Sequence, residues 1–267
     1  KVTDLVARDE FGEEVCAAES AELGAVDREA IKAAARSPLA EALFTVQWQP
    51  AENQSVKSQP AADQPSSDQL AVIGRLSPDL SAALEGAQTY AQLADLAEGI
   101  SSGEGLDASG QAPQLAAALI ECPQPQSTTP DAAASELSAW ALGVVKGWLE
   151  IEESAAGPLV ILTRGAMAAE SGESADLALS ALWGLVRSAQ SEHPGRFALV
   201  DLPMALEDTN QEDADQLAAA LQSALHSVGD EPQLAIRLSG LFAPRLAGAG
   251  AAIELPAVDS DQVSSWH

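Results

Sequence analysis

The sequence has few cysteine, aromatic and basic residues. Its two cysteines, Cys16 and Cys122, stand far apart and outside any CxxC or Cys/His spacing, so the sequence predicts neither a disulfide framework nor a zinc site. We expect both to be small buried apolar residues and assign no metal-binding residue. Aromatic residues make up 4% of the chain and all hydrophobic residues 46%, so Ala, Leu and Val must fill the interior.

The charge is strongly one-sided. The chain has thirteen basic and forty acidic residues, which gives a formal net charge of −27. Such a charge repels phosphate backbones and anionic lipids, so we expect no nucleic-acid and no membrane partner. No apolar run approaches the roughly 20 residues that cross a bilayer. The opening run KVTDLVARDE lacks the apolar core of a secretion signal, so we expect a cytoplasmic protein. Because it also lacks an initiator Met, we expect the chain to be part of a longer polypeptide.

Apolar runs and amphipathic stretches alternate along the chain. Strands are predicted over residues 43–49, 70–74, 115–122, 159–163 and 197–202, with a closing hairpin over 233–238 and 241–245. Helices are predicted after Ser77-Pro78, around Tyr90 to Glu98, and over residues 130–150, 174–192 and 213–228. Strands that alternate with helices indicate an α/β protein with a parallel sheet, right-handed crossovers and a Rossmann-like fold.

Three stretches do not follow this pattern. Residues 1–40 contain a short strand over 2–6 and are otherwise predicted to be an acidic linker with a helical piece over 27–35. Residues 50–68 are rich in Gln, Ser, Pro and Ala and are predicted to form a loop. The tail from Gly248 is predicted to be a linker.

A Rossmann-like layout raises the question of a dinucleotide cofactor. Its pyrophosphate needs a glycine-rich turn between a strand and a helix N-terminus. The predicted strands are followed instead by RLSPDL, PQPQ and RGAMAAESGES, and no convincing helix follows Gly248-Ala249-Gly250. We therefore assign no cofactor-binding residue.

Reduction of a ketone also needs a proton donor, normally a Tyr with a Lys four residues later. The only tyrosine is Tyr90, and the fourth residue after it is Ala94, so we assign no catalytic residue and expect Tyr90 to pack against a helix.

Two further residues each allow two interpretations. His193, in the run HPG, could be a general base or could close a helix C-terminus, and the missing orienting partner favours the second. Arg164 follows a strand, where α/β proteins bind ligands, but it could equally hold a neighbouring loop or a partner domain.

Three runs carry a resemblance to a known family. They are the L-x-V-x-W pattern of Leu43, Val46 and Trp48, the run TRGA at 163–166, and WGLVRSAQSEHPGRFALVDL at 183–202. Together they resemble the ketoreductase region of bacterial modular type I polyketide synthases, and specifically its N-terminal structural half. The similarity extends over residues 43–245.

The resemblance implies a truncated Rossmann-like (short-chain dehydrogenase-like) subdomain without an active site. It would lie in a multifunctional enzyme of antibiotic or other secondary-metabolite biosynthesis, beside a catalytic half that uses NADPH to reduce β-ketoacyl chains on the phosphopantetheine arm of a carrier protein. It also implies three segments: residues 1–40 as the tail of an upstream dehydratase-like domain, 41–247 as the subdomain, and 248–267 as a linker after which an enoyl reductase can be inserted. Two other hypotheses stay open, a stand-alone α/β enzyme and an interaction module.

Overall fold

The computed structural model describes residues 2–8, 14–21, 43–51, 69–102, 115–151, 157–204 and 211–248. The chain forms two units, residues 1–45 with 246–267 and residues 46–245, which we describe separately. In the first unit, strands β1 (Val2–Arg8) and β2 (Glu14–Ala21) form an antiparallel hairpin. Residues 14–21 are thus a strand that the sequence did not predict, because acidic residues interrupt the apolar alternation that would have revealed it. The predicted helical piece at 27–35 lies outside the described residues.

The second unit is built on one eight-stranded sheet with the order β3-β10-β9-β8-β7-β6-β4-β5. Its strands are β3 (Phe44–Pro50), β4 (Leu70–Ile73), β5 (Gln88–Tyr90), β6 (Ala117–Glu121), β7 (Leu159–Arg164), β8 (Phe197–Leu202), β9 (Gln233–Arg237) and β10 (Gly240–Gly248). Neighbours from β5 to β9 are parallel, whereas β10 runs antiparallel to β9. The sheet is therefore mixed, and the predicted closing hairpin is the reason.

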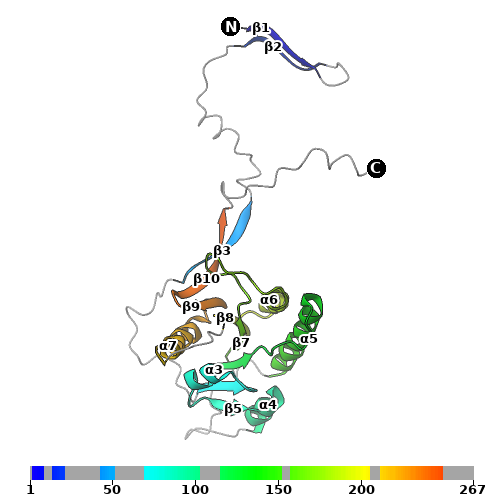
Figure 1. The fold of residues 1–267 in the computed structure, drawn as a ribbon. Helices are drawn as coiled ribbons and strands as arrows, with labels where there is room; N and C mark the ends of the chain where they lie inside the picture. Colours follow the sequence, from blue (N-terminus) through cyan, green and yellow to red (C-terminus); the bar gives the residue numbers. More distant parts are fainter. Residues whose placement is uncertain are drawn as a thin grey trace. The chain divides into compact units, whose positions relative to one another are not determined.

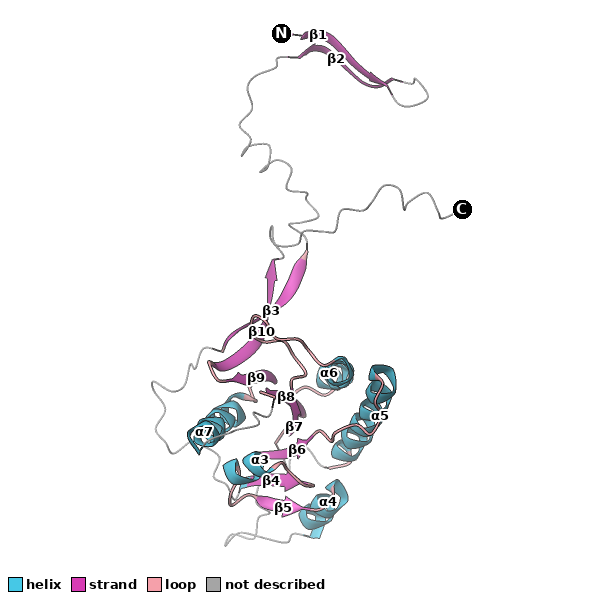
Figure 2. Ribbon diagram, in the orientation of Figure 1, coloured by secondary structure: helices cyan, strands magenta, loops and turns pink. Residues whose placement is uncertain are grey.

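Helices cover both faces of this sheet (Figures 1 and 2). Helices α4 (Leu93–Ser102), α5 (Pro130–Leu149) and α6 (Leu177–Glu192) lie on one face, and α3 (Pro78–Ala83) and α7 (Gln211–Ser227) lie on the other. Side chains of β4 alternate between two apolar cores: Ala71 and Ile73 enter the first, and Leu70 and Val72 the second. The continuous apolar runs of the sequence are thus strands buried on both sides, and the predicted α/β Rossmann-like class is confirmed.

The helix expected around Tyr90 to Glu98 is present as α4, but it begins only at Leu93, because residues 88–90 form a short strand, β5. A strand of three residues is too short to show a period in the sequence. The ring of Tyr90 nevertheless lies against α4, beside Gly99, as expected for a tyrosine that packs a helix.

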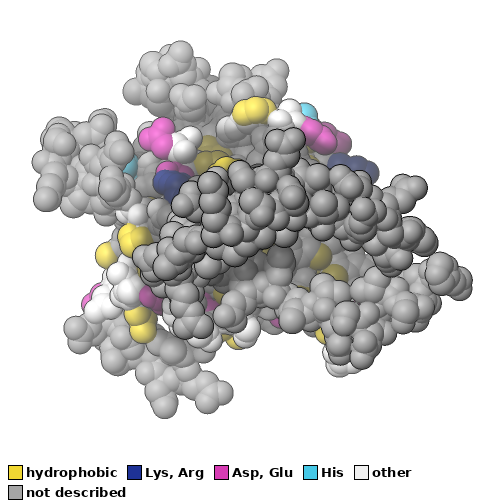
Figure 3. All heavy atoms as spheres, turned by 90° about the horizontal axis from the view of Figure 1, so that it is seen from above, with side chains coloured by type: hydrophobic (Ala, Val, Ile, Leu, Met, Phe, Trp, Pro, Cys, Tyr) yellow, Lys and Arg dark blue, Asp and Glu magenta, His cyan; other side chains and the backbone are white. Residues whose placement is uncertain are grey.

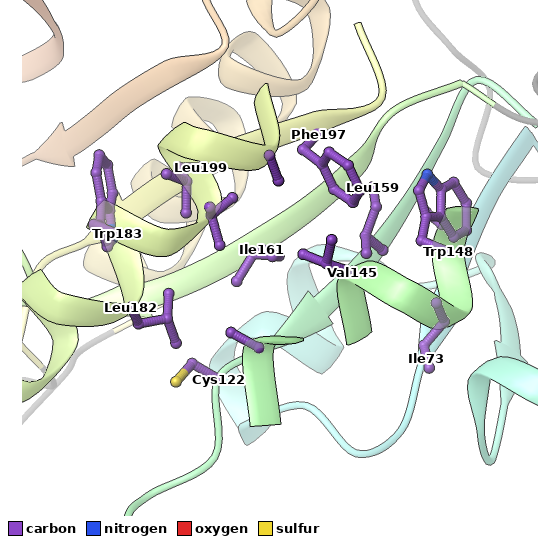
Figure 4. Packing of buried hydrophobic residues seen from close by; sticks show 14 of the residues in the cluster. Ile73, Cys122, Val145, Trp148, Leu159, Ile161, Leu182, Trp183, Phe197 and Leu199 are labelled. Atoms are coloured by element: carbon purple, nitrogen blue, oxygen red, sulfur yellow. The ribbon is translucent and has the colours of Figure 1, made fainter. Parts of the chain in front are cut away.

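Two fully buried tryptophans, Trp148 and Trp183, dominate the core under α5 and α6 (Figure 4). Trp183 donates a hydrogen bond from Nε1 to Oγ1 of Thr163, 3.0 Å away, and its ring meets the edge of Trp48 with 5.9 Å between centroids. The tryptophan of the L-x-V-x-W pattern thus anchors β3 to the core. Val46, two residues before Trp48 on the same strand, is 58% exposed.

We predict that Trp183→Ala lowers the free energy of unfolding by about 3–5 kcal/mol, because the substitution leaves a large cavity and removes a hydrogen bond to the buried Thr163 hydroxyl. Urea unfolding followed by circular dichroism measures this loss. Leu177→Ala is the matched control on the same helix, since Leu177 is 72% exposed and its truncation should cost less than about 0.5 kcal/mol. Equal losses for the two variants would contradict the central role of Trp183.

Candidate functional site at the carboxyl edge of the sheet

Chain connectivity places a crevice between β4 and β6. After β4 the chain crosses to β5 on one side, and then returns to β6 on the other side of β4. Open α/β sheets bind ligands outside the carboxyl ends of the strands at such a reversal. A cavity of about 660 Å³ lies here, and its lining includes Gly74, Arg75, Ser77, Glu121, Cys122, Trp140 and Arg164. This edge is therefore the first place to look for a site.

The carboxylate of Glu121 occupies the turn where a cofactor phosphate would be expected. Ser77, the residue before α3, donates its backbone N–H to Oε2 of Glu121 over 2.6 Å and its hydroxyl to Oε1 over 3.0 Å. The Ser77 hydroxyl makes no cap hydrogen bond to α3, because it turns to Glu121 instead. The Glu121 carboxylate thus binds the backbone N–H of Ser77, which precedes α3.

Arg164 joins this carboxylate to its surroundings. Its Nε donates to Glu121 over 3.3 Å, and its Nη2 donates to the Ser77 hydroxyl over 2.9 Å and to Oδ2 of Asp79 over 2.7 Å. Its Nη1 reaches the carbonyl oxygen of Pro203, 3.4 Å away. One guanidinium therefore ties together the ends of β4, β6, β7 and β8. Of the two interpretations of Arg164, these contacts fit the one in which it holds neighbouring loops.

The charges of this cluster reinforce one another. Partial burial raises the pKa of Asp79, but the hydrogen bond from Arg164 and the charge of Arg164 outweigh this effect, so the pKa lies below its ordinary value. Asp79 therefore stays ionised at neutral pH. Two carboxylates, those of Asp79 and Glu121, share one guanidinium within this edge.

A dinucleotide does not fit these residues. The Ser77 N–H, which would have to meet a diphosphate, is already bound to Glu121, and a second anion there would be repelled by that carboxylate. Gly74, with φ of +79°, is the only glycine in the turn between β4 and α3. A pyrophosphate needs several glycines to approach the backbone closely.

A second polar network lies at the ends of β7, β8 and β9, and sequence reasoning missed it. Asp201 is fully buried and accepts hydrogen bonds from Thr163 Oγ1 (2.7 Å), the Ala166 N–H (2.8 Å) and Arg237 Nη2 (2.8 Å). Arg237 also donates from Nε to Glu173 over 2.7 Å. The sequence did hold a signal for this network, since the apolar runs FALVDL and QLAIRL each contain one charged residue, Asp201 and Arg237.

This network has a structural role. Its contacts fix the loop between β7 and α6, because Arg237 also donates to the carbonyl of Met167 over 2.7 Å. Burial raises the pKa of Glu173, but hydrogen bonding to Arg237 and its charge more than compensate, so the pKa falls below its usual range. The buried carboxylate and guanidinium are paired with each other, as stable buried charges must be.

The other residues considered from the sequence lie apart from one another. Tyr90 donates its hydroxyl to Gln88 over 2.8 Å. His193 stands at the C-terminal cap of α6, where its backbone N–H donates to Ala189 over 2.8 Å. Cys122 is buried, whereas the surroundings of Cys16, Ala249 and Gly250 are outside what the structure describes. Within the described ranges no group of His, Cys, Asp and Glu is arranged to hold a metal ion, and no helix is long and apolar enough to cross a membrane.

A second cavity, of about 520 Å³, opens between α3 and α7. Apolar side chains form much of its wall, among them Pro78, Met204, Leu217, Ile236 and Leu238. Arg164 and Arg237 also line it, and each of them is held by carboxylates, as described above.

Comparison with known proteins identifies the fold and its context. Residues 46–246 match the family described as the Rossmann fold domain of the polyketide synthase extender module SpnB. The chain belongs to this family. The structure of an A1-type ketoreductase superposes on 79% of the chain with a TM-score of 0.57 and 26% identity, and that of A-type ketoreductases from modular polyketide synthases with a TM-score of 0.55 and 26% identity. The resemblance noted in the sequence is thereby confirmed.

Relatives of this polyketide synthase Rossmann domain are far longer than the chain itself. Polyketide synthase GfsA of Streptomyces halstedii is 33% identical over 96% of the chain, which spans 3% of that protein. The pikromycin polyketide synthase component PikAII of Streptomyces venezuelae is 33% identical over 92% of the chain, which spans 7% of that protein. The chain also spans only 43% of the two ketoreductase structures. It therefore corresponds to a small part of each relative.

We predict that Arg164→Met lowers the free energy of unfolding by about 1.5–3 kcal/mol, because it removes charge-assisted hydrogen bonds from partly buried carboxylates. Arg75→Met is the matched control, since Arg75 is exposed at the same edge and its loss should change stability by less than about 0.5 kcal/mol. Urea denaturation at neutral pH measures both. If Arg164→Met were as harmless as Arg75→Met, the cluster would not stabilise this edge.

We also predict that the Cys122 thiol is inert in the folded protein. Burial, and then the charges of Glu121 and Asp176, raise the pKa of Cys122 from 9.0 to about 12. At pH 8 this leaves on the order of a thousandth of the thiolate expected at the ordinary pKa. In a Cys16→Ser variant, Ellman's reagent should therefore label the native protein far more slowly than the urea-unfolded protein. Equal rates would show that the thiol is accessible and ionised.

Proposed function

We propose that the chain is the catalytically inert scaffold half of a polyketide synthase ketoreductase. In this proposal it stabilises a catalytic half that uses NADPH to reduce β-ketoacyl chains held on a carrier protein. Residues 41–247 form the scaffold, residues 1–40 are the tail of a dehydratase-like domain, and residues 248–267 lead to the next domain. The segment itself has no catalytic, cofactor-binding or metal-binding residue and acts in the cytoplasm.

The observation that carries the proposal is the hydrogen bonding of Glu121 to the turn before α3. A functional Rossmann half keeps the donors of this turn free for the cofactor. Here the backbone N–H and the hydroxyl of Ser77 both bind Glu121, and Arg164 holds that carboxylate in place. The chain has the fold of a cofactor-binding domain, but the hydrogen-bond donors at its binding edge are occupied by its own side chains. This suits a domain whose role is to contact and stabilise a partner domain.

Family membership supports the same view of the partners. The relatives are polyketide synthases, and the structural neighbours are ketoreductases more than twice as long as the shared region. The proposed partners are therefore further parts of the same polypeptide: the catalytic ketoreductase half, an upstream dehydratase, and an enoyl reductase where one is inserted.

The test separates this scaffold from a stand-alone enzyme. The chain alone, the catalytic half alone and the two together are assayed for NADPH oxidation with a β-ketoacyl thioester. We expect activity to be high only for the combination, with a higher melting temperature than either part has alone. Calorimetry on the isolated chain should give a Kd for NADPH no tighter than millimolar, because the phosphate donors are engaged.

Two outcomes would overturn the proposal. Turnover by the isolated chain would support the alternative of a stand-alone α/β enzyme. If adding the chain changes neither the activity nor the melting temperature of the catalytic half, the result would support the other alternative, an interaction module for a different partner.

A further inference from the structure

The cavity between α3 and α7, of about 520 Å³, has the size of a small-molecule site. Such sites enclose about 300–1,000 Å³, are mostly apolar and carry a few polar groups that orient the ligand. We call it the α3/α7 cavity. Its lining includes residues from the start of α3, from the middle of α7 and from the carboxyl ends of β7, β8 and β9. These strand ends belong to the edge at which open α/β sheets bind ligands.

Two large apolar side chains are exposed at this cavity. Met204 is 68% exposed and Leu238 is 65% exposed, and both belong to the lining. Single exposed hydrophobic residues are ordinary, and Figure 3 shows hydrophobic side chains beside charged ones on the described surface. Here, however, the two share one cavity with the buried Ile236 and the partly buried Leu217. Exposed apolar side chains that gather around a hollow are typical of a ligand-binding groove.

The charges around the α3/α7 cavity disfavour an anion. Arg164 and Arg237, the two arginines of the lining, each contact two carboxylates. Two positive and four negative charges leave these clusters with a formal balance of −2. An anionic ligand would therefore be repelled, and it would meet guanidinium groups that are already bound. Gln216, exposed in the lining, offers an uncharged amide that can donate and accept a hydrogen bond.

We infer that the α3/α7 cavity binds an uncharged, mainly apolar small molecule that carries a carbonyl or hydroxyl group. The apolar walls supply most of the contact, and Gln216 supplies a hydrogen bond to the polar group. A medium-chain ester has this chemistry. The corresponding fatty acid, which is ionised at neutral pH, has the same tail and the wrong charge. The inference goes beyond the proposed function and does not depend on it, because a domain that only stabilises a partner needs no ligand of its own.

The experiment measures binding of the neutral dye Nile red, which becomes fluorescent in apolar surroundings, to the full chain. Methyl octanoate and octanoate then compete with the dye, and they differ in charge but share one alkyl tail. We expect methyl octanoate to displace the dye at a concentration at least about tenfold lower than octanoate does, because the carboxylates around the cavity repel the anion. Methyl octanoate should also raise the melting temperature of the chain, since it binds the folded state.

Two variants change exposed residues of the lining. Leu238→Asp adds a carboxylate, and Met204→Gln keeps the length of the side chain but removes its apolar character. Leu177→Asp is the matched control, because Leu177 is 72% exposed on α6, on the other face of the sheet (Figure 2). All three variants should keep the wild-type melting temperature. We expect Leu238→Asp to raise the Kd for Nile red at least about tenfold and Met204→Gln at least about threefold, whereas Leu177→Asp should change it less than about twofold.

Four outcomes would overturn the inference. The first is that Nile red shows no saturable binding to the wild-type chain. The second is that Leu238→Asp and Met204→Gln both bind the dye as tightly as the wild type. The third is that Leu177→Asp weakens binding as much as Leu238→Asp, which would place the dye elsewhere. The fourth is that octanoate competes as well as its methyl ester, which would show that anions are not excluded. If one of the two cavity variants folds poorly, the other decides.

Discussion

The pairing of Arg164 with Glu121 organises the carboxyl edge of the sheet. Strands β4, β6 and β7 end there, and their ends bring polar backbone groups and acidic side chains close together. The guanidinium draws the carboxylates of Glu121 and Asp79 to one point, and Glu121 in turn binds the turn before α3. Without this cation, the two carboxylates would lose the positive charge that both of them contact.

Buried charged groups are paired elsewhere in the unit as well. Asp201 and Arg237 are charged residues inside strands, and the fold tolerates both because they bond to each other and to nearby backbone groups. The two networks lie along one edge of the sheet, at the ends of successive strands. In a cofactor-binding domain this edge commonly holds the ligand, whereas here its hydrogen-bonding capacity is used within the chain.

The sheet and most of its helices could be predicted from the sequence because their signals are local. β8 begins and ends at the predicted residues, and α6 ends at the predicted residue, Glu192. β5 and β2 could not be predicted in this way, since one is too short and the other too acidic for an alternating pattern. The hydrogen bonding of Glu121 to Ser77 was also beyond reach. Ser77 and Glu121 are 44 residues apart in the chain, and nothing local to either of them indicates the other.

The shortness of β5 has a consequence for a protein whose relatives are assembled from many parts. β5 is the last strand at one end of the described sheet, where it pairs with β4, and it is only three residues long. A longer edge would be a template on which a strand from a neighbouring sheet, or from another copy, could align and propagate. Three residues allow too few hydrogen bonds to make such a misplaced pairing persist. The shortness of β5 therefore limits such pairing at this end of the sheet.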